Sequence, residues 1–142
     1  MNASSILIVL VALATPSMVW ATEPPLKTFD GTWKGSLVCG DEGAEVAFSA
    51  ARRAQIKNGR ITLRRGQPNR NRFEAWEGVV EATGSVMIFG RYFWKTQKPL
   101  WFKGQVTGRK LKAVGQRGPK VCELSLVRVI GKTKPKAKRK VR

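Results

Sequence analysis

The sequence predicts an all-β protein, a small antiparallel β-barrel or sandwich of about eight short strands, closed by one disulfide. Trp33, Leu37 and Cys39 share one face of an early strand, because side chains alternate along a strand with a period of two. Cys122 and Leu124 share a face in the last apolar segment. Short alternating segments separated by turns rich in Gly, Asn and Pro fill the chain between them, and no long amphipathic helix is evident. We therefore expect the first and last strands to meet.

The N-terminal segment, residues 1–21, is predicted to be a signal peptide. Residues 6–14 form an unbroken apolar run, and residues 19–21 offer a site for cleavage after Ala21. The run is shorter than the ~20 apolar residues that a membrane-spanning helix needs. Because no charged side chain precedes the run, an uncleaved interfacial anchor is the alternative interpretation. We expect an exported protein, periplasmic or secreted.

Export also accounts for the two cysteines. Cysteines in an oxidising compartment pair readily, so we predict a disulfide between Cys39 and Cys122 rather than two buried thiols. Such a bridge closes a loop that includes most of the domain, and the chain-entropy model then gives a stabilisation of about 4 kcal/mol. Two cysteines without any histidine are too few for an ordinary zinc site, so we predict no metal and no cofactor.

The chain is strongly basic, with 27 Lys and Arg residues against 9 Asp and Glu residues and a net charge of +18. Seven of the cations lie in residues 132–142, which lack apolar periodicity and are predicted to be a disordered basic tail. Removing those seven from +18 leaves +11 on residues 22–131, the predicted β-barrel domain. The excess of positive charge is therefore not confined to the tail.

The first half of the domain is expected to begin with a strand over residues 32–39. Residues 44–56 alternate at Val46 and Phe48 and are interpreted as a bulged strand rather than a helix. The dipeptide Asn58-Gly59 predicts a two-residue type I′ hairpin, whose central residues both need positive φ. Residues 60–64 form the returning strand, and residues 65–72 form a polar, basic loop.

The second half is expected to contain strands over residues 73–81, 86–94, 100–106, 111–115 and 121–129. The segment 86–94 is apolar on both faces, which predicts a strand that is central or covered on both sides. Residues 95–99 are predicted to be a loop and residues 116–120 a turn. Glycines inside these strands fit the bends of a barrel.

The tripeptide Gly31-Thr32-Trp33 resembles the Gly-x-Trp of the first strand in lipocalins and avidin-type barrels. In those families the tryptophan closes the floor of the barrel, so the resemblance implies a structural role for Trp33. The longer pattern, Phe-Asp-Gly-Thr-Trp-x-Gly-x-Leu-x-Cys early and Cys-x-Leu-x-Leu at the end, is similar to small exported proteins of Gram-negative, mainly alphaproteobacterial, genomes. That similarity implies the compartment and the barrel, and it brings no catalytic residue to this chain.

The residues that most enzymes use are missing or scattered, so we predict a protein that is not an enzyme. Without histidine there is no imidazole base and no Ser-His-Asp triad. Glu74 and Glu77 are expected on opposite faces of one strand, which does not suit a glycosidase pair, and each is expected to balance a nearby arginine. Asp41, Glu42 and Glu45 suit a solvated turn better than a calcium site, because their spacing is not that of an EF-hand.

Aromatic and cationic residues alternate in the region of residues 91–103. A small barrel interior must be filled by side chains, so we predict that Phe93 or Trp94, whichever faces inward, belongs to the core. Trp101 and Lys103 are better candidates for a surface that binds by stacking and by charge. The predicted polyanion-binding residues are Arg60, Arg64, Arg65, Arg70, Arg72, Arg91, Lys95, Trp101, Lys103, Lys136, Lys138, Arg139 and Lys140.

The sequence as a whole predicts an exported cationic binding module for anionic polymers of the envelope or the cell exterior. The candidate partners are lipopolysaccharide, anionic lipid or nucleic acid bound without sequence specificity. One alternative is a lipocalin-like carrier of a small apolar ligand, and another is an inhibitor or partner of an acidic protein. The charge can also serve solubility alone. A roomy interior of a few hundred Å3 would favour the carrier, and a filled barrel with a basic flank would favour the polymer binder.

Overall fold

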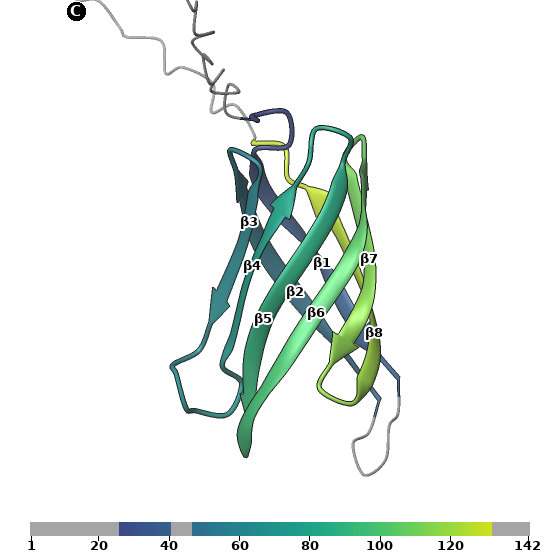
Figure 1. The fold of residues 1–142 in the computed structure, drawn as a ribbon. Helices are drawn as coiled ribbons and strands as arrows, with labels where there is room; N and C mark the ends of the chain where they lie inside the picture. The colour runs from purple at the N-terminus through teal and green to yellow at the C-terminus, as the bar shows by residue number, and fades with distance from the viewer. Residues whose placement is uncertain (1–25, 41–46, 132–142) are drawn as a thin grey trace, which may run out of the picture.

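The computed structural model describes residues 26–40 and 47–131, which form a closed barrel of eight antiparallel strands (Figure 1). The strands are β1 (Gly31–Cys39), β2 (Phe48–Lys57), β3 (Arg60–Arg65), β4 (Glu74–Val80), β5 (Ser85–Trp94), β6 (Thr96–Thr107), β7 (Lys110–Arg117) and β8 (Lys120–Arg128). Each strand pairs with its neighbours in sequence, and β1 also pairs with β8. The predicted all-β barrel is thereby confirmed, whereas the predicted signal peptide and basic tail lie outside the described residues.

The turn between β2 and β3 has the geometry that its sequence predicts. Asn58 has a φ of 51° and Gly59 a φ of 73°, so both central residues take the positive φ of a type I′ turn. Lys57 and Arg60 are the cross-strand partners that flank the turn. The backbone N–H of Asn58 donates to Asp30 Oδ1 at 2.7 Å, which ties this turn to the segment that enters β1.

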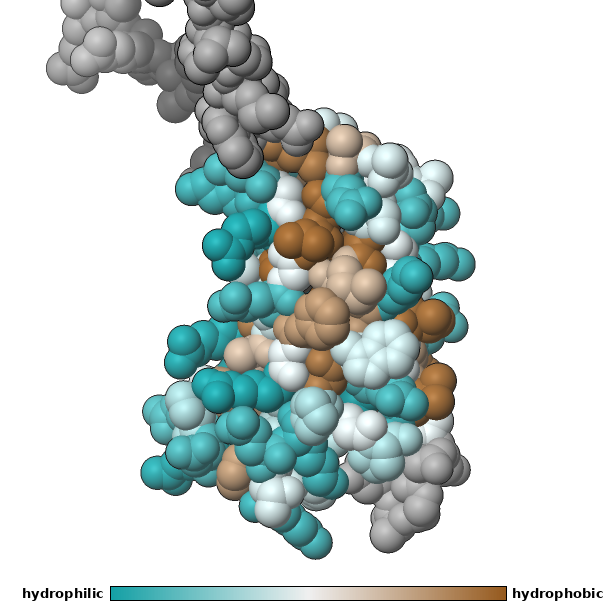
Figure 2. All heavy atoms as spheres, in the orientation of Figure 1, coloured by the Kyte–Doolittle hydropathy of each residue, from teal (hydrophilic) through white to brown (hydrophobic). Residues whose placement is uncertain are grey.

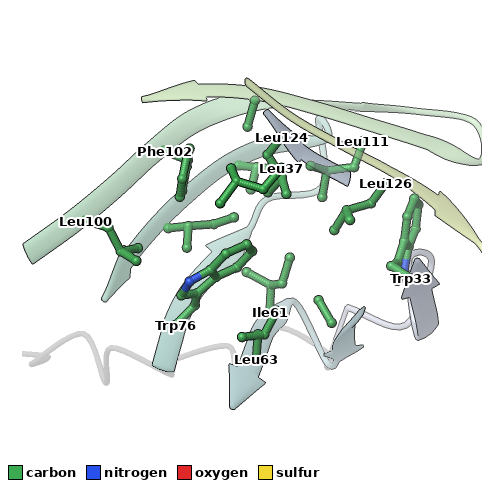
Figure 3. Packing of buried hydrophobic residues seen from close by; sticks show 14 of the residues in the cluster. Trp33, Leu37, Ile61, Leu63, Trp76, Leu100, Phe102, Leu111, Leu124 and Leu126 are labelled. Carbon is green, nitrogen blue, oxygen red and sulfur yellow. The ribbon is translucent and has the colours of Figure 1, made fainter. Parts of the chain in front are cut away.

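The core fills the barrel from the end at which β1 begins, as the side chains of Figure 3 show. Trp33 is fully buried there, and its indole Nε1 donates to the carbonyl oxygen of Phe29 at 3.0 Å. Leu37, Trp76 and Phe102 continue the core towards the middle of the barrel. The burial of Trp33, predicted from its shared face with Leu37, is confirmed. We call this end the Trp33 end.

Glycines let neighbouring strands approach closely inside the barrel. A Cβ atom on Gly35 would collide with the carbonyl oxygen of Ser125, and one on Gly115 would collide with that of Trp101. The position of these glycines on the inward face agrees with the tight coiling of a small closed sheet.

The predicted disulfide is present. Cys39 and Cys122 are direct partners in the pairing of β1 with β8, with their Cα atoms 4.1 Å apart. Both cysteines are buried, and they lie at the end of the barrel opposite Trp33. The bridge therefore closes the seam at which the first strand meets the last.

Four local predictions were wrong. The register of β1 on β2 runs without interruption, so β2 has no bulge. The predicted loop 95–99 is reduced to a turn at Lys95 because β6 begins at Thr96, and the predicted turn 116–120 shrinks because β7 extends to Arg117. The inward-facing ring near the end of β5 that joins the core is Tyr92, whereas Trp94 is 48% exposed.

The apolar residues of β5 predicted a strand that is central or covered on both sides. β5 is central, because it lies between β4 and β6 in the sheet, but it is not covered on both sides, since Phe89 on the outer face is 60% exposed. A closed barrel of this size has a single core inside, so nothing in the fold itself covers the outer wall. Within the described residues there is no helix of the length and hydropathy that a transmembrane span requires.

Replacing Trp33 by alanine is expected to lower the free energy of unfolding by about 3–5 kcal/mol, because it empties a fully buried site. The matched control is Trp101→Ala, which removes an indole that is 41% exposed on the outer wall and should cost about 1 kcal/mol or less. Urea unfolding followed by circular dichroism measures both. Equal losses for the two variants would contradict the assignment of Trp33 to the core.

Candidate functional site

A cavity of about 500 Å3 lies at the end of the barrel opposite Trp33, where β1–β2, β3–β4, β5–β6 and β7–β8 connect. We call it the end cavity. Its described lining residues are Ala47, Phe48, Ala50, Arg52, Arg65, Arg72, Glu74, Phe93, Trp94, Arg117 and Lys120. The barrel is therefore filled along most of its length and hollow at one end.

Strand alternation explains why charged side chains reach the interior at this end. Arg52 lies in phase with the buried Ala54 of β2, and Glu74 lies in phase with the buried Trp76 of β4. Lys120 lies in phase with Cys122 at the start of β8. Glu74 and Lys120 begin their strands at the open end, and Arg52 lies on the inward face of β2 below Ala50, so together they form a polar layer above the apolar core.

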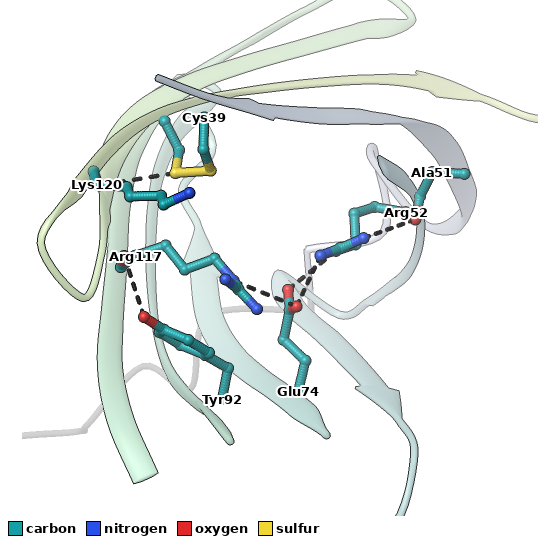
Figure 4. Close-up of polar contacts among 8 residues, drawn as sticks. Cys39, Ala51, Arg52, Glu74, Tyr92, Arg117 and Lys120 are labelled. Carbon is teal, nitrogen blue, oxygen red and sulfur yellow. Dashed lines mark hydrogen bonds and ion pairs between the residues drawn. A yellow bond between two sulfur atoms is a disulfide. The ribbon is translucent and has the colours of Figure 1, made fainter. Parts of the chain in front are cut away.

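Arg52 and Glu74 form a bidentate ion pair inside the barrel (Figure 4). Arg52 Nε donates to Glu74 Oε1 at 3.0 Å and Nη2 donates to Oε2 at 2.8 Å, while Nη1 donates to the carbonyl oxygen of Ala51 at 2.9 Å. Both side chains are 2% exposed. Two buried charges are tolerated only when paired and hydrogen-bonded in this way, so the pair fixes β2 relative to β4.

Arg117 places a second guanidinium beside the same carboxylate. Its Nε lies 3.7 Å from Glu74 Oε2, a separation that is too long for a hydrogen bond but close enough for a favourable charge interaction. The guanidinium carbon lies 3.6 Å from the centroid of the Tyr92 ring, and the Tyr92 hydroxyl donates to the carbonyl oxygen of Arg117 at 3.3 Å. Stacking on Tyr92 fixes the planar group, which lies between the Tyr92 ring and Glu74 in Figure 4 and belongs to the lining of the end cavity.

Lys120 brings a third cation into the interior. Its side chain is 2% exposed, and its Nζ lies 5.1 Å from the centroid of the Phe48 ring. Figure 4 shows the lysine chain beside the disulfide, opposite Arg52 and Glu74. A buried ammonium attracts negative charge strongly because little water screens it.

The described lining of the end cavity carries an excess of positive charge. Five lining residues are cations, Arg52, Arg65, Arg72, Arg117 and Lys120, and one is a carboxylate, Glu74. Arg65 and Arg72 are exposed at the rim, whereas Arg52 and Lys120 are buried. Walls of low dielectric focus the field of such a cluster into the cavity, so an anion is the ligand that the charge favours.

The described lining also contains apolar residues. Phe48, Phe93 and Trp94 contribute aromatic rings, and Ala47 and Ala50 contribute small side chains that leave space. A cavity with apolar walls and a few polar groups at fixed positions is typical of a site for a small organic molecule, and about 500 Å3 is a usual size for one.

The structure separates the predicted polyanion-binding residues into groups. Arg65 and Arg72 line the end cavity, and Arg70 and Lys95 lie in the β3–β4 and β5–β6 connections at the same end. Arg64 points outward from β3 near this rim. A connection between β3 and β4 is present where the polar, basic loop 65–72 was predicted, and its Arg65 and Arg72 line a cavity that the sequence did not predict.

The other predicted residues lie away from that rim. Arg60 is at the Trp33 end and forms an exposed ion pair with Glu77 at 3.6 Å. Arg91, Trp101 and Lys103 face outward on the wall formed by β5 and β6. Lys136, Lys138, Arg139 and Lys140 lie outside the described residues, as do the acidic residues of the 41–46 loop.

Sequence reasoning missed Arg52, Arg117 and Lys120 as site residues, and it assigned Glu74 only to charge balance. A signal was available, because each of these charged residues interrupts an otherwise apolar inward face, Arg52 within β2, Glu74 at the start of β4, Arg117 at the end of β7 and Lys120 at the start of β8. The described part of the chain contains no group of three His, Cys, Asp or Glu residues that could hold a metal ion. The fold and the site together define a disulfide-bonded up-and-down barrel with a cationic end cavity.

Comparison of the chain with protein-family models, with curated proteins and with solved structures finds no match.

Replacing Glu74 by glutamine is expected to lower the free energy of unfolding by about 3–5 kcal/mol, because Arg52 and Arg117 then face each other without the carboxylate between them. Urea unfolding of the purified protein measures the loss. The matched control is Glu77→Gln, which breaks an exposed pair on the same strand and should cost less than about 1 kcal/mol. Similar costs for the two variants would show that the inner pair does not hold the strands together.

Proposed function

We propose that this protein is a non-catalytic binding module that holds a small organic anion in the end cavity. The ligand has one carboxylate, phosphate or sulfonate group and an apolar body. The observation that carries the proposal is the combination, in the described lining, of five cations and one carboxylate with aromatic walls around about 500 Å3. The anionic group would lie against Arg117 and Lys120, and the apolar body would contact Phe48 and Trp94.

The charge of the lining favours an anion over the purely apolar ligand that the sequence also suggested. An apolar molecule would displace water from the exposed guanidinium groups at the rim, and it would offer no acceptor to Arg117 or Lys120. A charge-assisted hydrogen bond to either cation contributes about 1.5–3 kcal/mol, which corresponds to roughly ten- to hundredfold in affinity.

Octanoate is expected to bind with a stoichiometry of one, and octanol, which has the same apolar chain, is expected to bind at least about tenfold more weakly. Octylammonium should bind least, because it brings a like charge to the cationic lining. Isothermal titration calorimetry at constant ionic strength measures all three ligands.

The matched pair of variants for this experiment is Lys120→Gln and Lys34→Gln. Lys120 is buried in the end cavity, whereas Lys34 is exposed on the outer face of β1. Lys120→Gln should weaken octanoate binding by about tenfold or more, and Lys34→Gln should leave it unchanged. Octanol binding as tightly as octanoate, with no effect of Lys120→Gln, would favour the apolar carrier instead.

A second candidate function is the attachment to anionic polymers that the sequence predicts. The observation that favours it is the position of Arg64, Arg65, Arg70 and Arg72, which follow one another along the end of β3 and the β3–β4 loop. Four exposed guanidinium groups on one folded segment can contact successive phosphates of a polymer. Arg60 does not belong to this group, because it lies at the Trp33 end and pairs with Glu77.

For DNA and for lipopolysaccharide, the logarithm of the association constant should fall linearly with the logarithm of the salt concentration between about 50 and about 200 mM. The reason is that each contact with a phosphate releases counterions. Replacing these four arginines by glutamine should flatten the slope for DNA by up to about 0.9 per lost contact. Deleting residues 132–142 provides the comparison, since it removes seven cations from outside the barrel. Failure of both polymers to bind at the low-salt end would eliminate this candidate.

A further inference from the structure

The outer wall of the barrel carries exposed apolar side chains that form one continuous stripe over β4–β7. Phe89 on β5 and Trp101 on β6 are direct cross-strand partners, 60% and 41% exposed. Met87 lies two residues before Phe89 on the same face and pairs with Val79 of β4. Figure 2 shows the apolar surface of this side of the molecule, bordered by hydrophilic residues. The apolar stripe consists of Val79, Met87, Phe89, Trp101 and Val114.

The apolar stripe has no function in the fold or in the end cavity. Its residues point away from the core, and no segment within residues 26–40 and 47–131 covers Phe89 or Trp101. Single exposed apolar residues are ordinary on protein surfaces, but a contiguous group that includes two aromatic rings marks an interaction surface. The outward-facing apolar residues of segment 86–94, which is apolar on both faces of its strand, belong to this surface.

Cations border the apolar stripe. Arg91 follows Phe89 by two residues, and Lys103 follows Trp101 by two residues and lies between Met87 and Val114 across the sheet. Lys112 precedes Val114 by two residues on β7, and Arg60 is the cross-strand partner of Val79. Two carboxylates also border the apolar stripe, since Glu77 is the cross-strand partner of Phe89 and Glu123 is that of Val114, and Glu77 is paired with Arg60.

The charge on this wall selects among the partners that could cover an apolar surface. A second copy of the chain would bring Arg91 and Lys103 towards identical cations, which opposes self-association. An anionic bilayer attracts each of those cations, with an energy of about 1 kcal/mol per residue near the surface. The headgroup region also accepts Trp and Phe rings, and a soft interface can follow the convex wall of a barrel.

We infer that the wall formed by β4–β7 is a peripheral docking surface for bilayers that contain anionic phospholipid. Phe89 and Trp101 enter the headgroup region, and Arg91, Lys103 and Lys112 contact lipid phosphates. This inference does not depend on a ligand in the end cavity, because none of the docking residues Phe89, Arg91, Trp101, Lys103 and Lys112 lines that cavity.

The test is flotation of the exported protein with vesicles of phosphatidylcholine alone or with about one third phosphatidylglycerol. Wild-type protein should float with the anionic vesicles and not with the neutral ones. The variant Phe89→Ser/Trp101→Ser should bind the anionic vesicles at least about tenfold more weakly, since it removes two exposed aromatic rings. Its matched control, Val38→Ser/Val127→Ser, removes two exposed apolar residues from β1 and β8 and should bind like wild type.

The charge arm of the test uses Arg91→Gln/Lys103→Gln with Lys34→Gln/Arg53→Gln as its control. Lys34 and Arg53 are exposed cross-strand partners on β1 and β2, outside the wall of the apolar stripe. Only the first pair of changes should weaken anionic-vesicle binding and reduce its salt dependence. All variants retain both termini of the chain, so the differences between them report on the two walls alone.

A conservative variant separates membrane contact from loss of folding. Trp101→Phe should keep vesicle binding within about threefold of wild type, because a ring of similar hydrophobicity remains. It should also lose most of the tryptophan quenching that brominated lipids cause in wild-type protein. The inference is overturned if Phe89→Ser/Trp101→Ser binds like wild type, if wild type ignores anionic vesicles, or if wild type is a dimer in solution that this double variant converts to a monomer.

Discussion

Closure of the barrel is the constraint on which every other feature depends. Once β1 pairs with β8, each side chain of the eight strands must point either into a single enclosed interior or to the outside. The interior is narrow, so large apolar side chains such as Trp33 and Trp76 fill it across its width. Charged side chains that face inward cannot reach solvent through the closed sheet. They therefore contact one another near the end of the barrel. The pairing of Arg52 with Glu74 follows from that geometry.

The same closure explains how the end cavity is kept open. The bidentate bond between Arg52 and Glu74 spans the interior from β2 to β4, and Arg117 reaches the same carboxylate from β7. Three strands are thus held at fixed separations by charge rather than by apolar packing. On β2, the next inward-facing residue towards the open end after Arg52 is Ala50. Its small side chain leaves the space next to the charged residues unfilled. The polar layer therefore lies between the apolar core and the end cavity and separates the two.

Much of the fold could be predicted because its determinants are local. Period-two alternation, the Asn58-Gly59 turn and the placement of both cysteines on apolar faces are each legible within a few residues. The end cavity could not be predicted in the same way, because Arg52, Glu74, Arg117 and Lys120 are separated along the chain and meet only through the register of the closed sheet. The predicted arginines of residues 64–72 were found because they cluster in sequence. Strand 86–94 was misjudged because apolar residues on two faces resemble a buried strand whether or not anything covers the second face.

The two ends of the described barrel differ in a way that gives the molecule a direction. β1 begins and β8 ends beside Trp33, and the N–H of Val129 donates to the carbonyl oxygen of Thr32 at 2.8 Å. The chain therefore enters and leaves the barrel at one pole, and the end cavity lies at the other (Figure 1). Any tether joined to either terminus, whether a natural anchor or an engineered support, would hold the barrel by its closed pole. The end cavity would then lie at the pole that faces away from the point of attachment.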